Sequence, residues 1–190
     1  MSKSFRYDAD EYLEAYRTKG QFPLIHEPIA KVMREVYDGE SVVMDLGASI
    51  GVLAARLIEQ LGAPLVVAIE PRHSATKSVL MPKICWVGIP VNRQTFAAVD
   101  LLVKKWGVKY VVARRVFPEI EERGGDGTVR ELANVLADAG VEKIVLEGRF
   151  RTKRATSSLP NADAEVSALS DRFSLDKRAN WREVRYLTRK

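Results

Sequence analysis

The sequence predicts an α/β protein with a doubly wound, mostly parallel sheet that ends in an antiparallel edge hairpin. Strand-like and helix-like segments alternate along most of its 190 residues. The strand-like segments are short and almost continuously apolar, as expected for parallel strands that are buried on both faces. The segments between them carry apolar residues at helical spacing. Right-handed crossovers would then place helices on both faces of one sheet.

Five core strands are expected in the middle of the chain. Amphipathic helices separate several of them, and two of these helices stop at a glycine. The expected strands cover residues 41–46, 64–70, 84–91, 108–116 and 141–148, and the expected helices cover 52–62, 95–107 and 126–140.

The N-terminal part is expected to add helices to this core. Residues 8–16 and 27–39 each place apolar side chains on one helical face. We expect residues 1–38 to form N-terminal helices that act as a lid, and residues 39–190 to form the α/β core of the same single domain.

The C-terminal part is expected to close the sheet. Residues 149–163 are polar and basic, and they are expected to form a loop within the domain. Residues 173–190 alternate in polarity around a predicted turn at Ala179–Asn180, which indicates an antiparallel hairpin at the edge of the sheet.

Composition narrows the functional classes. The formal net charge is +5 and the pI is about 9.3, which favours an anionic partner, although many proteins without one are equally basic. No apolar run is long enough to span a bilayer, and the polar N-terminus is unlike a signal peptide, so a cytoplasmic protein is expected. The single cysteine, Cys85, excludes an internal disulfide and a cysteine cage for zinc, and no metal site is predicted. The sequence does not predict the oligomeric state.

The stretch VVMDLGASIGVLAARL, residues 42–57, contains the clearest functional signal. The first strand ends near Asp45, a loop holding Gly47 and Gly51 follows, and a helix begins. In an open parallel sheet, ligands bind beyond the carboxyl ends of the strands. The next strand ends at Glu70, whose carboxylate can accept hydrogen bonds from both hydroxyls of a ribose. The register of these residues predicts a nucleoside-bearing cofactor.

The glycine spacing distinguishes between cofactors. Dinucleotide-binding folds use G-x-G-x-x-G and phosphate-binding loops use G-x-x-x-x-G-K-[ST]. Here the loop reads Gly47-Ala48-Ser49-Ile50-Gly51, which matches neither pattern.

The stretch from Asp45 to Gly51 resembles the first motif of class I S-adenosylmethionine-dependent methyltransferases, D/E-x-G-x-G-x-G, with Ser49 in place of the middle glycine. VVAIEP, residues 66–71, is similar to their second motif. Residues 110–120, 140–148 and 181–190 resemble their fourth, fifth and last strands. The resemblance implies S-adenosylmethionine as the cofactor. It implies a cofactor-binding set of Asp45, Gly47, Ala48, Ser49, Gly51, Glu70, Pro71 and Asn92, with Glu70 on the ribose and residues 90–92 near the adenine.

Each of these residues also has a purely structural interpretation. Gly47 and Gly51 could serve a tight turn and close helix packing. Asp45 could cap or brace the loop, and Glu70 could be an ordinary acid at the end of a strand. These alternatives stay open at the level of the sequence.

Basic residues follow several of the predicted strands, at the edge where the cofactor is expected. Arg93 follows the third strand, and Arg114 and Arg115 end the fourth, with Glu119 or Glu121 as a potential partner for one of them. The predicted acceptor-binding set is Arg114, Arg149, Arg151, Lys153 and Arg154, whose guanidinium and ammonium groups suit phosphate or carboxylate. The alternative is an ordinary solvated surface.

Catalytic residues are not marked by a motif. Methyl transfer is an in-line displacement in which positioning supplies much of the rate, so no covalent nucleophile is required. The candidates are His26, Arg114 and Arg115. His26 would act as a general base if the N-terminal segment lies over the site, and it is otherwise a surface histidine. Residues 113–118 lack the [DN]-P-P-[YFW] motif of enzymes that methylate amino groups of adenine or glutamine.

The sequence therefore predicts a methyltransferase that acts on an anionic acceptor, either nucleic acid or a small molecule bearing phosphate or carboxylate, with no membrane partner. One alternative is a non-catalytic module of the same fold that binds nucleic acid or a protein through its basic edge. A second is a nucleotide-binding oxidoreductase, which the missing third glycine disfavours.

Overall fold

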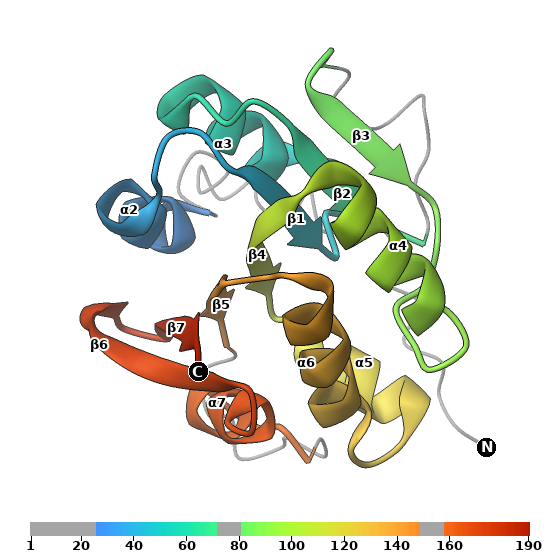
Figure 1. Cartoon of the computed structure of the whole chain (residues 1–190). Coiled ribbons are helices and arrows are strands. Elements are labelled where there is room, and N and C mark those ends of the chain that lie inside the picture. The colour runs from blue at the N-terminus through green and yellow to red at the C-terminus, as the bar shows by residue number, and fades with distance from the viewer. Residues whose placement is uncertain (1–25, 72–80, 149–157) are drawn as a thin grey trace, which may run out of the picture.

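The computed structural model describes residues 26–71, 81–148 and 158–190. They form one seven-stranded sheet with helices on both faces (Figure 1). The elements in chain order are α2 (Glu27–Val36), β1 (Val42–Leu46), α3 (Val52–Leu61), β2 (Val66–Ile69), β3 (Ile84–Val87), α4 (Phe96–Trp106), β4 (Val108–Arg114), α5 (Phe117–Gly124), α6 (Thr128–Ala139), β5 (Lys143–Glu147), α7 (Ala162–Leu169), β6 (Phe173–Trp181) and β7 (Val184–Arg189).

The strand order is β3-β2-β1-β4-β5-β7-β6. The first five strands are parallel, and β7 runs antiparallel to both β5 and β6. The predicted doubly wound sheet with a C-terminal antiparallel edge hairpin is confirmed. The order reverses at β1, which lies between β2 and β4, so this topology predicts a ligand site beyond the carboxyl end of β1.

Alternation along each strand divides the core into two layers. Met44, Val67 and Val111 pack with the layer that contains α4, α5, α6 and α7. Val43 and Val112 face the opposite way and pack with α2 and α3. Asp45 follows Val43 at a spacing of two, so its side chain points to the α2 and α3 face.

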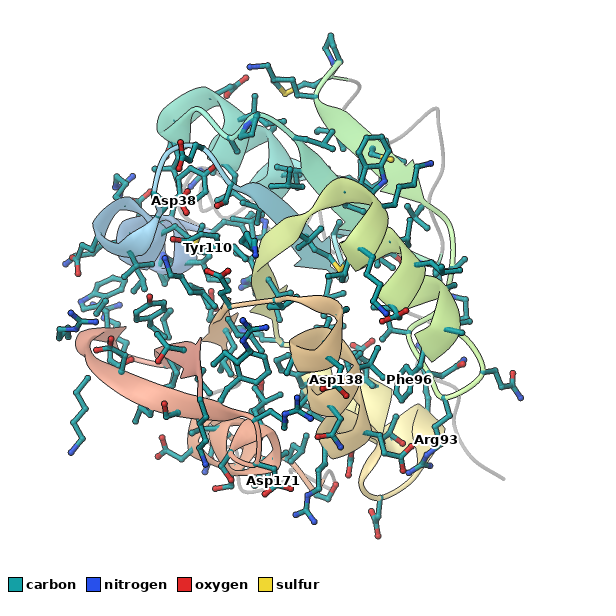
Figure 2. The ribbon with its side chains drawn as sticks, in the orientation of Figure 1. Asp38, Arg93, Phe96, Tyr110, Asp138 and Asp171 are labelled. Carbon is teal, nitrogen blue, oxygen red and sulfur yellow. The ribbon has the colours of Figure 1, made fainter. Side chains whose placement is uncertain are left out.

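Polar contacts fix the C-terminal end of α2 to the amino edge of the sheet. The hydroxyl of Tyr110 on β4 donates to the carbonyl of Val36 at 2.8 Å, and it accepts from the Lys143 ammonium group at 2.6 Å. Figure 2 shows Tyr110 near Asp38, just beyond the end of α2. A ten-residue helix is about 15 Å long, about the length of a five-residue strand. The start of α2, with His26, therefore lies toward the carboxyl edge of the sheet.

The C-terminal hairpin turns later than predicted. β6 continues through Ala179 and Asn180, and the turn falls after Trp181, where Arg182 has φ of 52°. Ala179 is buried against the α2 and α3 layer, and the Asn180 side chain accepts a hydrogen bond from the Tyr186 amide at 3.0 Å. These contacts keep both residues in the strand, so the predicted turn at Ala179–Asn180 was wrong.

Two short helices were not predicted. α5 follows β4 directly and has Pro118 in its first turn, and α7 begins after Asn161, whose side chain accepts from the Ala164 amide at 2.9 Å. Each has only 8 residues, too few for a clear helical period in the sequence. In the described ranges, no helix is long and apolar enough to cross a membrane.

Candidate cofactor site at the carboxyl edge

The loop after β1 forms the centre of the candidate site. Gly47, Ser49 and Gly51 all have positive φ, of 72°, 52° and 85°. The amides of Gly47 and Ala48 both donate to the Ile69 carbonyl at the end of β2, at 2.9 and 3.1 Å. The Gly51 amide donates to the Ala48 carbonyl at 2.8 Å. The loop is therefore bound tightly to the end of the neighbouring strand.

Gly47 has a packing role in addition to its backbone conformation. A Cβ atom at this position would lie 2.8 Å from Cγ2 of Val116, which caps α5. No side chain larger than hydrogen fits there without movement. This observation supports the structural interpretation of Gly47, and it also shows that β4 and α5 approach the loop closely from the opposite side to β2.

Glu70 binds the same loop from the end of β2. Its Oε2 atom accepts a hydrogen bond from the Ser49 amide at 3.0 Å. The four amides of Gly47, Ala48, Ser49 and Gly51 thus have partners within the protein. A pyrophosphate-binding loop needs such amides to point at the ligand. The geometry of this loop argues against a phosphate cradle.

Asp45 is a buried carboxylic acid beneath the loop. Its side chain is 2% exposed, and its Oδ2 atom has no hydrogen-bond partner among the described residues. Burial and the nearby Glu70 carboxylate raise the pKa of Asp45 to about 7. Both effects penalise the ionised form, and a positively charged group beside Asp45 would offset them and favour the carboxylate.

The hydroxyl of Ser49 is a second polar atom without a partner. Its Oγ atom is buried and makes no hydrogen bond in the part of the chain that the structure describes. Buried polar groups are nearly always hydrogen-bonded in folded proteins. The unsatisfied oxygens of Asp45 and Ser49, next to Glu70, are therefore groups whose hydrogen bonds a polar, cationic ligand would supply.

The remaining predicted cofactor residues lie around this loop. Ala48 is buried against α3, and Pro71 is exposed directly after Glu70. The side chain of Asn92 accepts from the Gln94 amide at 3.0 Å and so braces the turn before α4. Its predicted contact with adenine stays a prediction.

The predicted arginine pair is held by a residue that the sequence reasoning missed. Arg114 Nε and Arg115 Nη2 each lie 3.2 Å from a different carboxylate oxygen of Glu147, at the end of β5. Glu121, one of the two partners predicted, instead accepts from the amides of Gly127 and Val129 at the start of α6. Glu147 follows the same rule as Asp45 and Glu70, since each is an acid near the carboxyl end of a parallel strand.

His26 lies at this edge beside these arginines. Burial and the positive charges of Arg114, Arg56 and Arg115 lower the pKa of His26 to about 3. Its Nδ1 atom is buried without a hydrogen-bond partner in the described ranges. The imidazole is therefore neutral at pH 7, and the residue as a whole is half-buried at the start of α2.

Arg93 does not join this cluster. Its guanidinium group binds Glu131 on α6 at 2.8 Å and the carbonyl of Asp126 at 2.9 Å, and Figure 2 shows it beside α5 and α6. Of the predicted lid, residues 27–36 form α2, and residues 1–25 lie outside the described residues, as do the basic residues Arg149, Arg151, Lys153 and Arg154.

Comparison with known proteins gives a fold match without a sequence match. No protein-family model and no curated protein matches the sequence. Monomeric WbdD has a TM-score of 0.61 at 17% identity, over 90% of this chain and 41% of that chain. ChlM, the magnesium protoporphyrin IX methyltransferase from Synechocystis PCC 6803 solved with bound S-adenosylmethionine, gives 0.53 at 13% identity, over 100% of this chain and 87% of that chain. A chain of the fibrillarin/Nop5p complex gives 0.54 at 13% identity, over 86% and 81%.

The protein therefore has the class I methyltransferase-like fold, as the sequence resemblance predicted. WbdD is described as a bifunctional kinase-methyltransferase, and this chain spans about two fifths of its length.

Proposed function

We propose that the protein is an S-adenosylmethionine-dependent methyltransferase whose acceptor carries a negative charge. The observation that carries the proposal is the pair of acids at the loop, Asp45 and Glu70, together with loop amides that are already hydrogen-bonded within the protein. This arrangement favours a cationic, nucleoside-bearing cofactor over one that presents phosphate.

The residues present fit this cofactor. Glu70 would accept hydrogen bonds from the ribose hydroxyls, and Asp45 would face the positively charged end of the molecule. The loop from Gly47 to Gly51 would let the backbone approach it closely. When bound, the cofactor supplies a methyl group activated by a sulfonium. The chain's own part is to hold the reacting groups in line and to exclude water, which accounts for much of the rate in such displacements.

An anionic acceptor is supported by the charge at the same edge. The positive charges of Arg56, Arg114 and Arg115 all act on His26, and Glu147 lies between Arg114 and Arg115. The overall charge of +5 acts in the same direction.

The test is product formation. The protein is incubated with S-adenosylmethionine and a panel of carboxylate, phosphate and oligonucleotide acceptors, and S-adenosylhomocysteine is quantified. We expect acceptor-dependent release with anionic members of the panel and a large loss in Glu70→Ala. Cofactor binding without S-adenosylhomocysteine from any acceptor would instead support a non-catalytic binding module.

The matched control is Glu59→Ala, an exposed acid on α3. It should leave product release unchanged, because it removes the same charge without touching the loop. A nicotinamide cofactor that binds more tightly than S-adenosylmethionine would contradict the proposal and favour the oxidoreductase alternative.

A further inference from the structure

The turn between β6 and β7 lies at the same edge of the sheet as the cofactor loop. Trp181, the last residue of β6, pairs with Val184, and Val184 pairs with Glu147 at the end of β5. The Gly148 amide donates to the Glu183 carbonyl at 3.0 Å, which ties the turn to the chain that leaves β5. Because β5, β4 and β1 are parallel, the turn and the loop after β1 both lie at the carboxyl edge.

Trp181 also lies on the side of the sheet to which Asp45 points. Its side chain packs against the layer of α2 and α3, and β6 is the last strand of the sheet on that flank (Figure 1). Three strands separate β6 from β1, so the turn and the cofactor loop are roughly 19 Å apart along the edge, at about 4.8 Å per strand. A ligand that reaches both places is a polymer rather than a small molecule.

Two cations lie over the ring of Trp181. The ammonium group of Lys31, on α2, is 4.7 Å from the ring centroid, and the guanidinium carbon of Arg182 is also 4.7 Å from it. Neither cation forms an ion pair with a carboxylate in the part of the chain that the structure describes. An aromatic ring holds a cation without neutralising its charge. Both charges are therefore available to an external anion.

The hairpin around this ring is strongly basic. Residues 173–190 contain six lysines and arginines but only two acids. One of these acids, Asp176, already binds Arg178, whose Nε atom lies 3.0 and 3.1 Å from its two carboxylate oxygens. The pairing of β6 with β7 is irregular between Asp176 and Trp181, and the exposed Lys177 lies in this irregular stretch. The basic surface thus extends from the open edge of the sheet to the turn.

We propose that Lys31, Trp181 and Arg182 bind a single-stranded nucleic acid and lead it along the carboxyl edge toward the cofactor loop. The use of the strand at that loop rests on the proposed methyl transfer. Phosphate groups would contact the ammonium group of Lys31 and the guanidinium group of Arg182, and a base would stack on the ring of Trp181. A single strand is required, because a duplex keeps its bases stacked on one another.

The exchange of a cation for a base on the ring favours binding. A cation over an exposed ring contributes less than a base that stacks on the same ring. The cation that leaves the ring gains a phosphate, and counterions are released from the strand. Lys31 is exposed and Trp181 is half-buried, so both are accessible to such a ligand.

The test is fluorescence anisotropy with a labelled single-stranded oligonucleotide of about 12 nucleotides. We expect saturable binding to wild type, with an affinity that falls as salt is added. Lys31→Met and Arg182→Asn should each weaken binding about fivefold or more. Each should also reduce the slope of log affinity against log salt by about 0.7, the value for one phosphate contact on a single strand. Asparagine tolerates the left-handed φ of 52° at position 182.

Lys105→Met is the matched control. The ammonium group of Lys105 lies 5.0 Å from the centroid of the Trp106 ring, so it makes the same kind of contact on α4. α4 ends at Trp106, just before β4 begins, which places this pair at the amino edge of the sheet. The control should bind the oligonucleotide with the affinity and the salt slope of wild type.

The role of the ring is tested separately from that of the charges. Trp181→Leu keeps both cations and should weaken oligonucleotide binding about fivefold or more, while Trp181→Phe should bind more tightly than Trp181→Leu. Inorganic polyphosphate, which has no bases, should compete poorly with the oligonucleotide. Equal competition by polyphosphate, together with full binding by Trp181→Leu, would overturn the assignment to nucleic acid.

Calorimetry with S-adenosylmethionine on the same samples separates this inference from the proposed function. Lys31→Met, Arg182→Asn and Trp181→Leu should bind the cofactor as wild type does. Cofactor binding by wild type without oligonucleotide binding would overturn this inference and leave the methyltransferase proposal intact. The cations would then only keep the open edge of the sheet from pairing with another strand. Oligonucleotide binding without cofactor binding would support the surface and overturn the proposed function.

Discussion

The sharpest structural prediction concerns the substitution Gly47→Ala. The added methyl group would meet Cγ2 of Val116 at 2.8 Å and its Cβ at 3.1 Å, in a residue whose φ is 72°. A left-handed alanine costs about 1–2 kcal/mol. Overpacking of a filled core typically adds about 1–3 kcal/mol. The free energy of unfolding should therefore fall by about 2–5 kcal/mol.

Gly62→Ala separates the two contributions. Gly62 has φ of 71°, and a methyl group added to its Cα would have no heavy atom within 4 Å, so this substitution carries the conformational cost alone. The effect of alanine on the unfolded chain is common to both positions and cancels in their difference. The difference between Gly47→Ala and Gly62→Ala should be about 1–3 kcal/mol.

The assay is urea unfolding followed by circular dichroism, with Val116→Ala as a second background. If Val116 is the obstacle, Gly47→Ala should cost less in Val116→Ala than in wild type, because the 2.8 Å contact with Cγ2 is removed and only the 3.1 Å contact with Cβ remains. Equal costs for Gly47→Ala and Gly62→Ala in wild type would refute the packing argument.

Further predictions follow from other buried groups. Glu121→Gln should lower the free energy of unfolding by about 1–2 kcal/mol, since one amide at the start of α6 loses its acceptor. The control is Glu122→Gln, on the exposed side of α5, which should leave stability unchanged in the same urea experiment. Ser49→Gly should stabilise the ligand-free protein by about 1 kcal/mol, because glycine adopts positive φ without the cost that serine bears and has no unsatisfied hydroxyl. A loss of stability would contradict that reasoning. The pKa of Asp45 is raised from 3.8 to about 7 in the folded state, so the stability of wild type relative to Asp45→Asn should fall as pH rises from 4 to 7, and a flat difference would exclude the shift. The pKa of His26 is lowered from 6.5 to about 3, so wild type should lose stability relative to His26→Gln as pH falls below 6.5, and the opposite slope would refute its placement among the arginines.

Much of the fold could be predicted because its signals are local. The five parallel strands are apolar runs, and the helices over 96–106 and 128–139 have stripes and glycine stops that one sequence displays. The turn of the hairpin could not be predicted, because burial of Ala179 and the contact of Asn180 with β7 decide it. Tertiary contacts overrode a local turn signal there.

The candidate site also has a part that the sequence predicts and a part that depends on tertiary contacts. Asp45, Gly47 and Glu70 could be predicted from the register of acids and glycines at strand ends, since a parallel sheet brings strand ends to one edge. The pairing of Arg114 with Glu147 could not be predicted, because Glu147 is 33 residues away in the chain and becomes a neighbour only when β4 and β5 pair. The burial of His26 likewise depends on where α2 packs.

The measurement that tests the central claim most directly is calorimetric titration with S-adenosylmethionine at pH 7.5. Wild type and Glu70→Gln are compared, because glutamine can still accept the Ser49 hydrogen bond and so preserves the loop. We predict saturable binding to wild type, weakened by about 1–3 kcal/mol in Glu70→Gln through loss of the charged acceptor. No binding to folded wild type would contradict the account.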